Sequence, residues 1–429
     1  MAIMSVPNTL TATEIARQID SGKLTAEGVI RAHLERIDKR DADVLAWTHL
    51  ARDAALERAR VLDRGPRQGL LHGVPMGVKD IIDSHDQPTG YGSPIYQKHQ
   101  PLADAATVAL AKGAGAILLG KTVTTEFANR HPGRTRNPHN PEHTPGGSSS
   151  GSAAAVADFQ VTLATGTQTG GSVIRPAAFC GVVGYKPTFG HFPTAGMKAN
   201  TEWLDTIGAY ARSVEDIALF RAALMAIPYR PIEKLEAPPR IAVCFTPHKA
   251  ELQPEAVAAV QDAAKALAKA GAKVSELELP SPGPELREGQ KTLSAFEGPR
   301  AAADEARRFY GLLSKSFQQD KIGAGNKLDY AAWVAARKLG ERGRAMADAL
   351  FSDIDVILTP PAKGEAPAGL ERTGDATFNL IWTYLWMPCV TLPLTRGPSG
   401  LPVGIQLVGR QHEDQRLLDI AAWVRGALP

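Results

Sequence analysis

Hydrophobic positions along the chain recur first at helical spacing, and this predicts helices at the N-terminus. Apolar residues follow the capping box Thr11-x-x-Glu14 at intervals of three and four, which predicts a helix over residues 11–36. A second helix is predicted over residues 52–64, because Gly65-Pro66 ends its pattern. These two helices account for most of residues 1–69.

The next part of the chain, from residue 73 to about 192, carries only short apolar runs between Gly, Ser, Thr and Pro. Short apolar runs bounded by turn residues are typical of buried strands. We therefore predict strands at residues 116–119, 161–164 and 182–185, with helices at 105–112 and 152–158 between them.

Beyond residue 213 strand and helix patterns alternate. A strand (241–245), a helix that begins at a proline (254–270) and a further strand (273–279) predict a βαβ unit. We also predict helices at 213–226, 285–312, 328–351 and from 414, and strands at 356–359, 389–392 and 403–408. This alternation favours an α/β fold whose large sheet is mixed but mostly parallel and is covered by helices on both faces.

The chain shows no internal repeat and no convincing linker, because residues 228–239 have the composition of a surface loop. A chain of 429 residues is long enough to bury a large core. We therefore expect a single domain over residues 1–429, with a catalytic core at about 70–220 and with 228–429 completing the sheet and the substrate pocket.

Composition and charge exclude several classes of protein. With 48 Lys and Arg against 45 Asp and Glu and no basic stripe, the chain has no signal for binding nucleic acid. No apolar stretch approaches the ~18 residues that span a bilayer, and Met1–Asn8 lacks the features of a signal peptide. We expect a cytoplasmic protein without a membrane partner. Three widely spaced cysteines predict core thiols of a reducing compartment, and the histidines show no metal-ligand spacing; the cysteines are Cys180, Cys244 and Cys389.

Two glycine motifs suggest chemistry that their context does not support. Residues 115–122 match the phosphate-binding pattern G-x-x-x-x-G-K-T, but residues 116–119 form a predicted strand where a phosphate cradle needs a loop. Residues 147–151 match the nucleophile elbow G-x-S-x-G, but a proline-broken loop precedes them, and only His248 and His412 are offered as partners. A flexible Gly/Ser linker, with Ser148–Ser150 idle, is the remaining alternative for the second motif.

A third motif places a serine after two glycines, in Thr167-Gln-Thr-Gly-Gly-Ser172. Glycines allow a sharp turn, in which the N–H groups of Thr169, Gly170, Gly171 and Ser172 can converge on one oxyanion. A nucleophilic serine also needs a base. In the absence of a well-placed histidine, Lys79 between apolar neighbours is the candidate, and a structural ion pair is the alternative role for this lysine.

Taken in order, seven segments resemble the amidase signature family of serine hydrolases over most of the chain. They are residues 73–80 (GVPMGVKD), 119–128 (LGKTVTTEFA), 145–155 (PGGSSSGSAAA), 166–172 (GTQTGGS), 180–188 (CGVVGYKPT), 211–216 (ARSVED) and 401–406 (LPVGIQ). The string at 167–176 is most similar to the malonamidase-type branch. The resemblance implies a single-domain amidase-signature fold and an enzyme that hydrolyses small linear amides, with carbamates (urethanes) and aryl esters as further substrates.

The resemblance also assigns roles in a Ser-cisSer-Lys triad. Ser172 is the nucleophile, Ser148 the bridging serine after a cis peptide bond, and Lys79 the base, which has to be uncharged to accept a proton. The amides of Thr169, Gly170 and Gly171 form the oxyanion hole. Ser150 and Thr167 either support the hydroxyl network or are turn residues. The family chemistry needs no metal and no cofactor.

The sequence departs from the family pattern at two places. Gln168 and Ile174 stand where the family has Asp and Arg, and an arginine follows at Arg175. We interpret Arg175 either as a ligand of a substrate carboxylate or as a local structural residue. The second departure is at Trp386-Met-Pro, where family members commonly have a Gly-x-Pro step. We interpret Trp386 and the nearby Trp382 and Tyr384 either as an aromatic pocket wall or as core. A pocket wall would favour aryl-bearing substrates.

We expect a stand-alone enzyme that takes a small-molecule amide or carbamate. A homodimer is one possible assembly, since homodimers are common among similar proteins. The runner-up hypothesis is the glutaminase-type component of a tRNA-dependent amidotransferase, which works with partner subunits. A catalytically inactive binding protein on the same scaffold is a third hypothesis.

Overall fold

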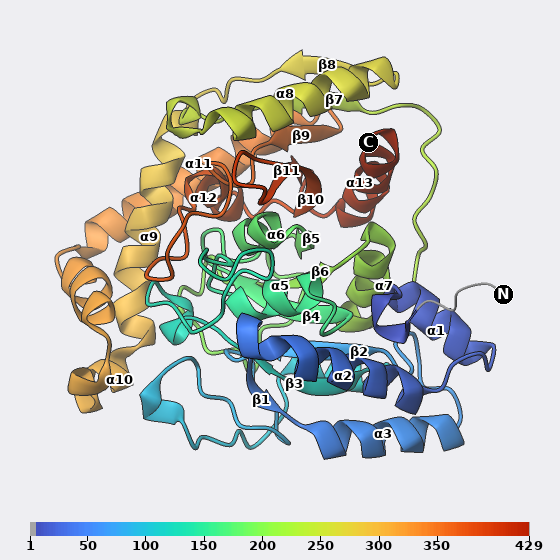
Figure 1. Cartoon of the computed structure of the whole chain (residues 1–429). Helices are drawn as coiled ribbons and strands as arrows, with labels where there is room; N and C mark the ends of the chain where they lie inside the picture. The colour runs from blue at the N-terminus through green and yellow to red at the C-terminus, as the bar shows by residue number, and fades with distance from the viewer. Residues whose placement is uncertain (1–5, 429) are drawn as a thin grey trace.

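One mixed sheet organises residues 6–428, which the computed structural model describes (Figure 1). Its eleven strands, counted over those residues, follow the order β1-β3-β2-β4-β6-β5-β10-β11-β9-β7-β8. The strands are β1 (Trp47–Leu50), β2 (Pro75–Lys79), β3 (Ile117–Thr122), β4 (Leu163–Gln168), β5 (Val183–Lys186), β6 (Thr206–Ala211), β7 (Arg240–Val243), β8 (Lys273–Glu276), β9 (Val356–Thr359), β10 (Cys389–Arg396) and β11 (Pro402–Val408). The predicted α/β fold with a large mixed sheet is confirmed. The stretch Met1–Asn8, for which we expect no signal peptide, lies mostly outside the described residues.

The prediction of a mostly parallel sheet is wrong. Within residues 6–428, six of the ten neighbouring strand pairs are antiparallel. Only β2–β3, β2–β4, β7–β8 and β7–β9 are parallel, and β7–β8 is the predicted βαβ unit. Hydrophobic periodicity reports how a strand is buried and not its direction, so the antiparallel centre of the sheet left no mark in the pattern.

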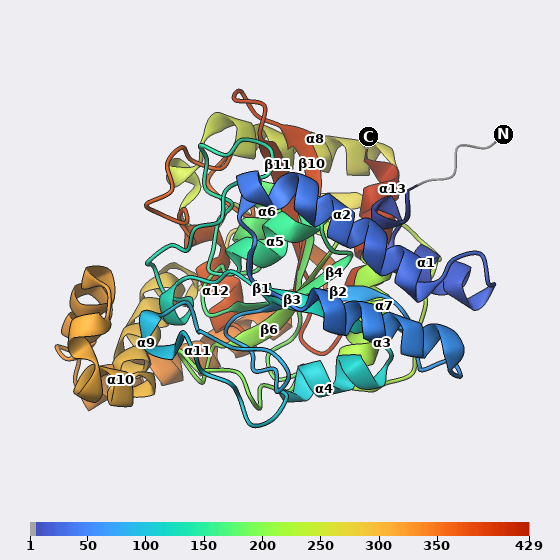
Figure 2. The same cartoon turned by 60° about the horizontal axis from the view of Figure 1, so that its bottom comes forward.

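Helices cover both faces of the sheet, as predicted (Figures 1 and 2). The helices of the described residues are α1 (Ala12–Asp20), α2 (Ala26–Val44), α3 (Arg52–Arg64), α4 (Ala106–Gly113), α5 (Ser150–Ala157), α6 (Ile174–Cys180), α7 (Val214–Met225), α8 (Pro254–Lys269), α9 (Leu286–Ala301), α10 (Ala303–Arg308), α11 (Tyr330–Leu350), α12 (Thr377–Tyr384) and α13 (Asp414–Ala427). One face packs against α4, α7 and α13. The other face packs against α5 and α6, with α2 outside them.

Side-chain alternation along β2 decides which face receives Lys79. Met76 and Val78 belong to the core on the α4 and α7 side of the sheet. Because successive side chains of a strand point to opposite faces, Gly77 and Lys79 face α5. The lysine at the end of β2 is thereby directed toward the serine-rich start of α5.

Several predicted elements differ from the observed ones. The helix predicted over 11–36 is two helices, separated by a turn in which Gly22 has a φ of +69°. The helix predicted over 285–312 divides into α9 and α10. Strand β3 continues to Thr122, so residues 117–122 of the phosphate-binding pattern belong to a strand and form no loop. The short helices α6 and α12, neither of which has a side-chain N-cap, were not predicted.

Other predictions concern surface and core. The three cysteines are buried and free, so the prediction of core thiols is confirmed. Residues 227–239 contain no helix or strand and form the long connection between α7 and β7 (Figure 1). Across the described part of the chain, every helix is too short or too polar to cross a membrane.

Candidate active site

Lys79 ends β2 inside the protein and contacts two hydroxyl groups. Its Nζ lies 2.7 Å from Ser148 Oγ and 2.6 Å from Thr167 Oγ1. The side chain is fully buried, and this burial lowers the pKa of Lys79 well below its ordinary value, although the charge of Asp205 opposes the shift. None of the ion pairs among residues 6–428 includes Lys79, so the alternative of a structural ion pair has no partner here. The amine is held in an environment that favours its neutral form.

The serines at the start of α5 hold the backbone of this segment in place, and Ser149 links it to β4. The peptide bond Gly147–Ser148 is cis. Ser149 Oγ accepts from the N–H of Thr167 at 3.2 Å, and Ser150 Oγ donates to the Gly146 carbonyl at 2.8 Å. All three serines are buried. A flexible linker with idle serines is therefore excluded.

Residues 169–172 join β4 to α6, and we call them the oxyanion loop after the role that the resemblance implies. The carbonyl groups of this loop are all held by donors. Gln290 Nε2 donates to the Thr169 carbonyl at 2.9 Å, and Thr383 Oγ1 donates to the Gly170 carbonyl at 2.7 Å. The Arg175 N–H donates to the Gly171 carbonyl at 2.9 Å, and the Tyr210 hydroxyl donates to the Ser172 carbonyl at 3.1 Å.

The N–H groups of this loop remain available. Within the described chain, the N–H groups of Gly170, Gly171 and Ser172 donate to no protein acceptor. In a trans peptide the C=O and N–H groups point in opposite directions, so donors behind the carbonyls direct the N–H groups the other way. Preorganised N–H donors of this kind are what an oxyanion hole requires.

Ser172 lies at the end of the oxyanion loop and is half-buried. The hydrogen bonds of this residue among the described atoms use its carbonyl and not its hydroxyl. The structure therefore brings Lys79, Ser148 and Thr167 into direct contact, and it places Ser172 five residues beyond Thr167 with a free hydroxyl. It does not form a hydrogen bond between Ser148 and Ser172.

Arg175 is buried in α6 and supports the serine segment. Its Nη2 donates to the Gly147 carbonyl at 2.6 Å. This carbonyl belongs to the peptide bond that precedes Ser148. Its Nε is buried without a partner. These contacts favour the local structural role of Arg175 over the binding of a substrate carboxylate.

The C-terminal aromatic residues occupy two different environments. Trp382 and Tyr384 are buried in a core cluster beneath α9 and α11. Trp386 is half-buried, stacks between Phe189 and Trp203, and donates its indole N–H to the Trp203 carbonyl at 2.9 Å. The core interpretation therefore suits Trp382 and Tyr384, and Trp386 belongs to an aromatic stack.

Sequence reasoning missed the residues that contact the oxyanion loop from outside. Asp205 accepts from the Thr169 hydroxyl, and it is buried with a raised pKa because burial disfavours its charge. Gln290 and Thr383 come from α9 and α12, far along the chain. No motif marks these residues, since each reaches the loop with a single side chain from a distant part of the sequence.

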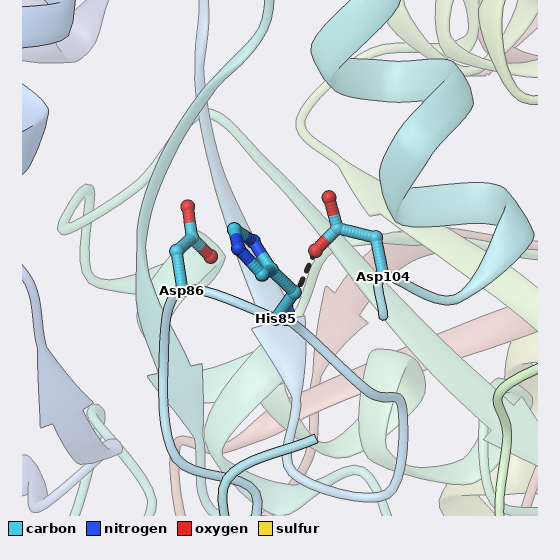
Figure 3. Close-up of side chains that lie close together, drawn as sticks. All are labelled: His85, Asp86 and Asp104. Carbon is cyan, nitrogen blue, oxygen red and sulfur yellow. Dashed lines mark hydrogen bonds between the residues drawn. The ribbon is translucent and has the colours of Figure 1, made fainter. Parts of the chain in front are cut away.

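A group of polar side chains at His85, Asp86 and Asp104 has the composition of a metal site (Figure 3). The Lys112 ammonium, however, lies 2.8 Å from Asp86 Oδ2 and 3.0 Å from Asp104 Oδ2. His85 is tied to Asp104 only through its backbone N–H, at 2.8 Å. Since a protein cation already pairs with both carboxylates, we assign no metal to this group.

Comparison with known proteins agrees with this architecture. A sequence model of the Amidase family matches residues 28–418. The chain is 30% identical to a glutamyl-tRNA(Gln) amidotransferase subunit of Clostridium botulinum (strain Alaska E43 / Type E3), covering 96% of this chain and 95% of that protein. The crystal structure of an amidase superimposes with a TM-score of 0.89 at 28% identity, covering 98% of this chain and all of the other. The peptide amidase of Stenotrophomonas maltophilia gives a TM-score of 0.81 at 28% identity, covering 97% and 96%.

The fold and the family match together define a hydrolase of C–N bonds with an α/β fold built on one mixed sheet. The chain belongs to the Amidase family.

Proposed function

We propose that the chain works alone as a hydrolase of small amides and forms an acyl-enzyme at Ser172. The observation that carries this proposal is the contact of a buried amine with a hydroxyl, Lys79 Nζ to Ser148 Oγ at 2.7 Å. Burial lowers the pKa of Lys79, so that its neutral amine is available as a base, and nucleophilic serines require a base.

The proposed reaction moves one proton back and forth along the triad. A hydroxyl both accepts and donates, so Ser148 passes its own proton to Lys79 and takes the proton of Ser172 as Ser172 Oγ attacks the carbonyl. The oxyanion accepts hydrogen bonds from the oxyanion loop. The proton returns through Ser148 to the departing amine as the C–N bond breaks. Water then attacks the acyl-enzyme by the same route and releases the acid.

The contacts of Thr167 and Ser150 support the roles proposed for these residues. The Thr167 hydroxyl is the second partner of Lys79 Nζ and holds the amine in place for Ser148. Ser150 holds the Gly146 carbonyl and so fixes the backbone that leads to Ser148. Both act by positioning the proton relay.

For the substrate we propose neutral linear amides, with carbamates and aryl esters as further substrates of the same acyl-enzyme chemistry. Arg175 is engaged with the Gly147 carbonyl, which leaves a small dicarboxylic monoamide of the malonamide type without its cation. Trp386, in the aromatic stack with Phe189 and Trp203, is the residue we propose for contact with aryl groups.

The test is a substrate panel measured with matched serine variants. Anilides, small aliphatic amides, aryl carbamates and aryl esters are assayed with wild type, Ser172→Ala and the surface control Ser352→Ala. We expect turnover of amides by wild type and S352A, no turnover by S172A, and a mass increase on Ser172 when an aryl carbamate acylates the enzyme. Turnover by S172A at the wild-type rate would overturn the assignment of the nucleophile.

A second candidate function is that of a glutaminase-type amidotransferase component, which works with partner chains. The similarity to the Clostridium botulinum protein over nearly the whole chain favours it. This function predicts that the isolated chain hydrolyses glutamine in preference to anilides and that partner subunits raise the rate. Efficient turnover of the panel by the isolated chain, without preference for glutamine, would support the stand-alone hydrolase.

A further inference from the structure

Gln168 lies behind the oxyanion loop with only one possible orientation of its side-chain amide. Its Oε1 accepts from the N–H of Val173 at 2.8 Å and from the N–H of Ile174 at 3.0 Å. Turning the amide over would set its NH2 group against these two donors, so the oxygen has to face α6. The Nε2 group is thereby directed at Thr383 Oγ1, 2.9 Å away.

This contact determines what the Thr383 hydroxyl does. Thr383 has one hydroxyl proton and two acceptors in reach, the Gly170 carbonyl at 2.7 Å and the Asn379 carbonyl at 3.1 Å. The Gln168 Nε2 group donates a hydrogen bond to the hydroxyl oxygen and cannot accept one from it, so the hydroxyl proton of Thr383 stays with these two carbonyls, of which that of Gly170 is the nearer. Both side chains are buried, and water does not compete for these bonds.

Helix α12 also limits how far the oxyanion loop can shift. A Cβ added to Gly171 would lie 2.3 Å from Asn379 Oδ1 and 3.1 Å from Ala376 Cβ, so the loop backbone packs directly on the helix. The Gly170–Gly171 peptide is therefore held in two ways: it packs against α12, and its carbonyl accepts a hydrogen bond from the Thr383 hydroxyl.

We propose that Gln168 and Thr383 are a positioning pair that sets the plane of the Gly170–Gly171 peptide and so directs the Gly171 N–H at the oxyanion. The inference rests on the proposed acyl-enzyme function. It also gives a physical meaning to the glutamine at this position: an aspartate can accept from the two N–H groups of α6 but cannot donate to Thr383.

Thr383 is tested by removing and then restoring its hydroxyl. Thr383→Val keeps the shape of the side chain but leaves the Gly170 carbonyl without its donor. Loss of an oxyanion donor lowers kcat by about 10²–10³, so for a misdirected donor we expect a fall in kcat of about 10- to 100-fold, with KM within about threefold. Thr383→Ser retains the hydroxyl and is expected to recover most of the lost rate.

Gln168 is tested by a change that keeps its acceptor and removes its donor. In Gln168→Glu the carboxylate still accepts from Val173 and Ile174, but it attracts the Thr383 proton away from Gly170. We expect a fall in kcat similar to that of T383V. The double variant should be no slower than T383V alone, because both changes remove the same hydrogen bond, from Thr383 to the Gly170 carbonyl. Additive losses would overturn the idea of a pair.

The control and a second readout separate positioning from folding. Thr359 is buried with an unpartnered hydroxyl, so Thr359→Val makes the same substitution without breaking a bond and should leave kcat unchanged. An arylboronic acid, which adds to a serine as a tetrahedral anion, should bind T383V more weakly by the same factor by which kcat falls. If T383V does not fold, Q168E carries the same test, and a wild-type kcat and boronate affinity of Q168E would then overturn the proposal.

The outcomes also separate this inference from the proposed function. If S172A is inactive while T383V and Q168E match wild type in kcat and boronate affinity, the positioning pair is wrong and the acyl-enzyme stands. If S172A retains wild-type turnover, the proposed function fails, and the positioning pair fails with it.

Discussion

Lys79→Met replaces the buried amine by an apolar side chain of similar length and tests the central feature of the site. General acid–base groups contribute about 10²–10⁴ to rate, so we expect kcat/KM of the variant to fall by at least about 10². In wild type, kcat/KM should decrease toward acid pH, because protonation of Lys79 removes the base. This limb should be absent from the residual activity of K79M.

The same variant changes how stability depends on pH. Burial lowers the pKa of Lys79 in the folded chain, whereas the unfolded chain keeps a value near 10.5. Between these two pKa values the unfolded chain binds one proton more than the folded chain, so wild-type stability rises with pH through this window and levels off above it. The slope reaches about 1.4 kcal/mol per pH unit for one such group.

The assay is urea unfolding of wild type and K79M from pH 6 to pH 10.5. Subtracting the two curves removes groups that both proteins share, including the buried Lys121, whose pKa burial lowers to about 8. We expect the free energy of unfolding of wild type minus that of K79M to increase with pH. A difference that stays flat, together with a flat acid limb in wild-type kcat/KM, would refute a neutral, buried lysine base.

Two further predictions concern Arg175 and Trp382. Arg175→Met leaves the Gly147 carbonyl unpaired, which should lower the free energy of unfolding by about 1–3 kcal/mol. The same change should lower kcat for neutral and for anionic amides by the same factor. A loss confined to anionic amides would instead make Arg175 a substrate ligand. Trp382→Ala opens a cavity in the core and should lower the free energy of unfolding, measured by urea titration, by about 3–5 kcal/mol. Trp386 is half-buried, so Trp386→Ala should lower the free energy of unfolding less. Equal losses in the two variants would contradict the core placement of Trp382.

The fold and the site were predictable from the sequence to different degrees. Strand β3 and helix α8 leave strong local patterns, and their presence was predicted. The antiparallel centre of the sheet was not, because strand direction depends on partners far along the chain. For the site, the residues themselves indicated Lys79 as a base, the family resemblance assigned Ser148, and the structure brings these two into contact. Gln290 and Thr383 were missed, because each contributes one contact from a helix that carries no motif of its own.

The sheet order also has a consequence for the synthesis of this protein. Strand β10 pairs with β5, and α12, just before β10, is the surface on which the oxyanion loop packs. A chain that is still emerging from the ribosome lacks both elements after its Lys79 and serine segments are complete. Because domains fold as cooperative units and distant contacts form late, the nascent chain should remain without hydrolytic activity until its last quarter has docked.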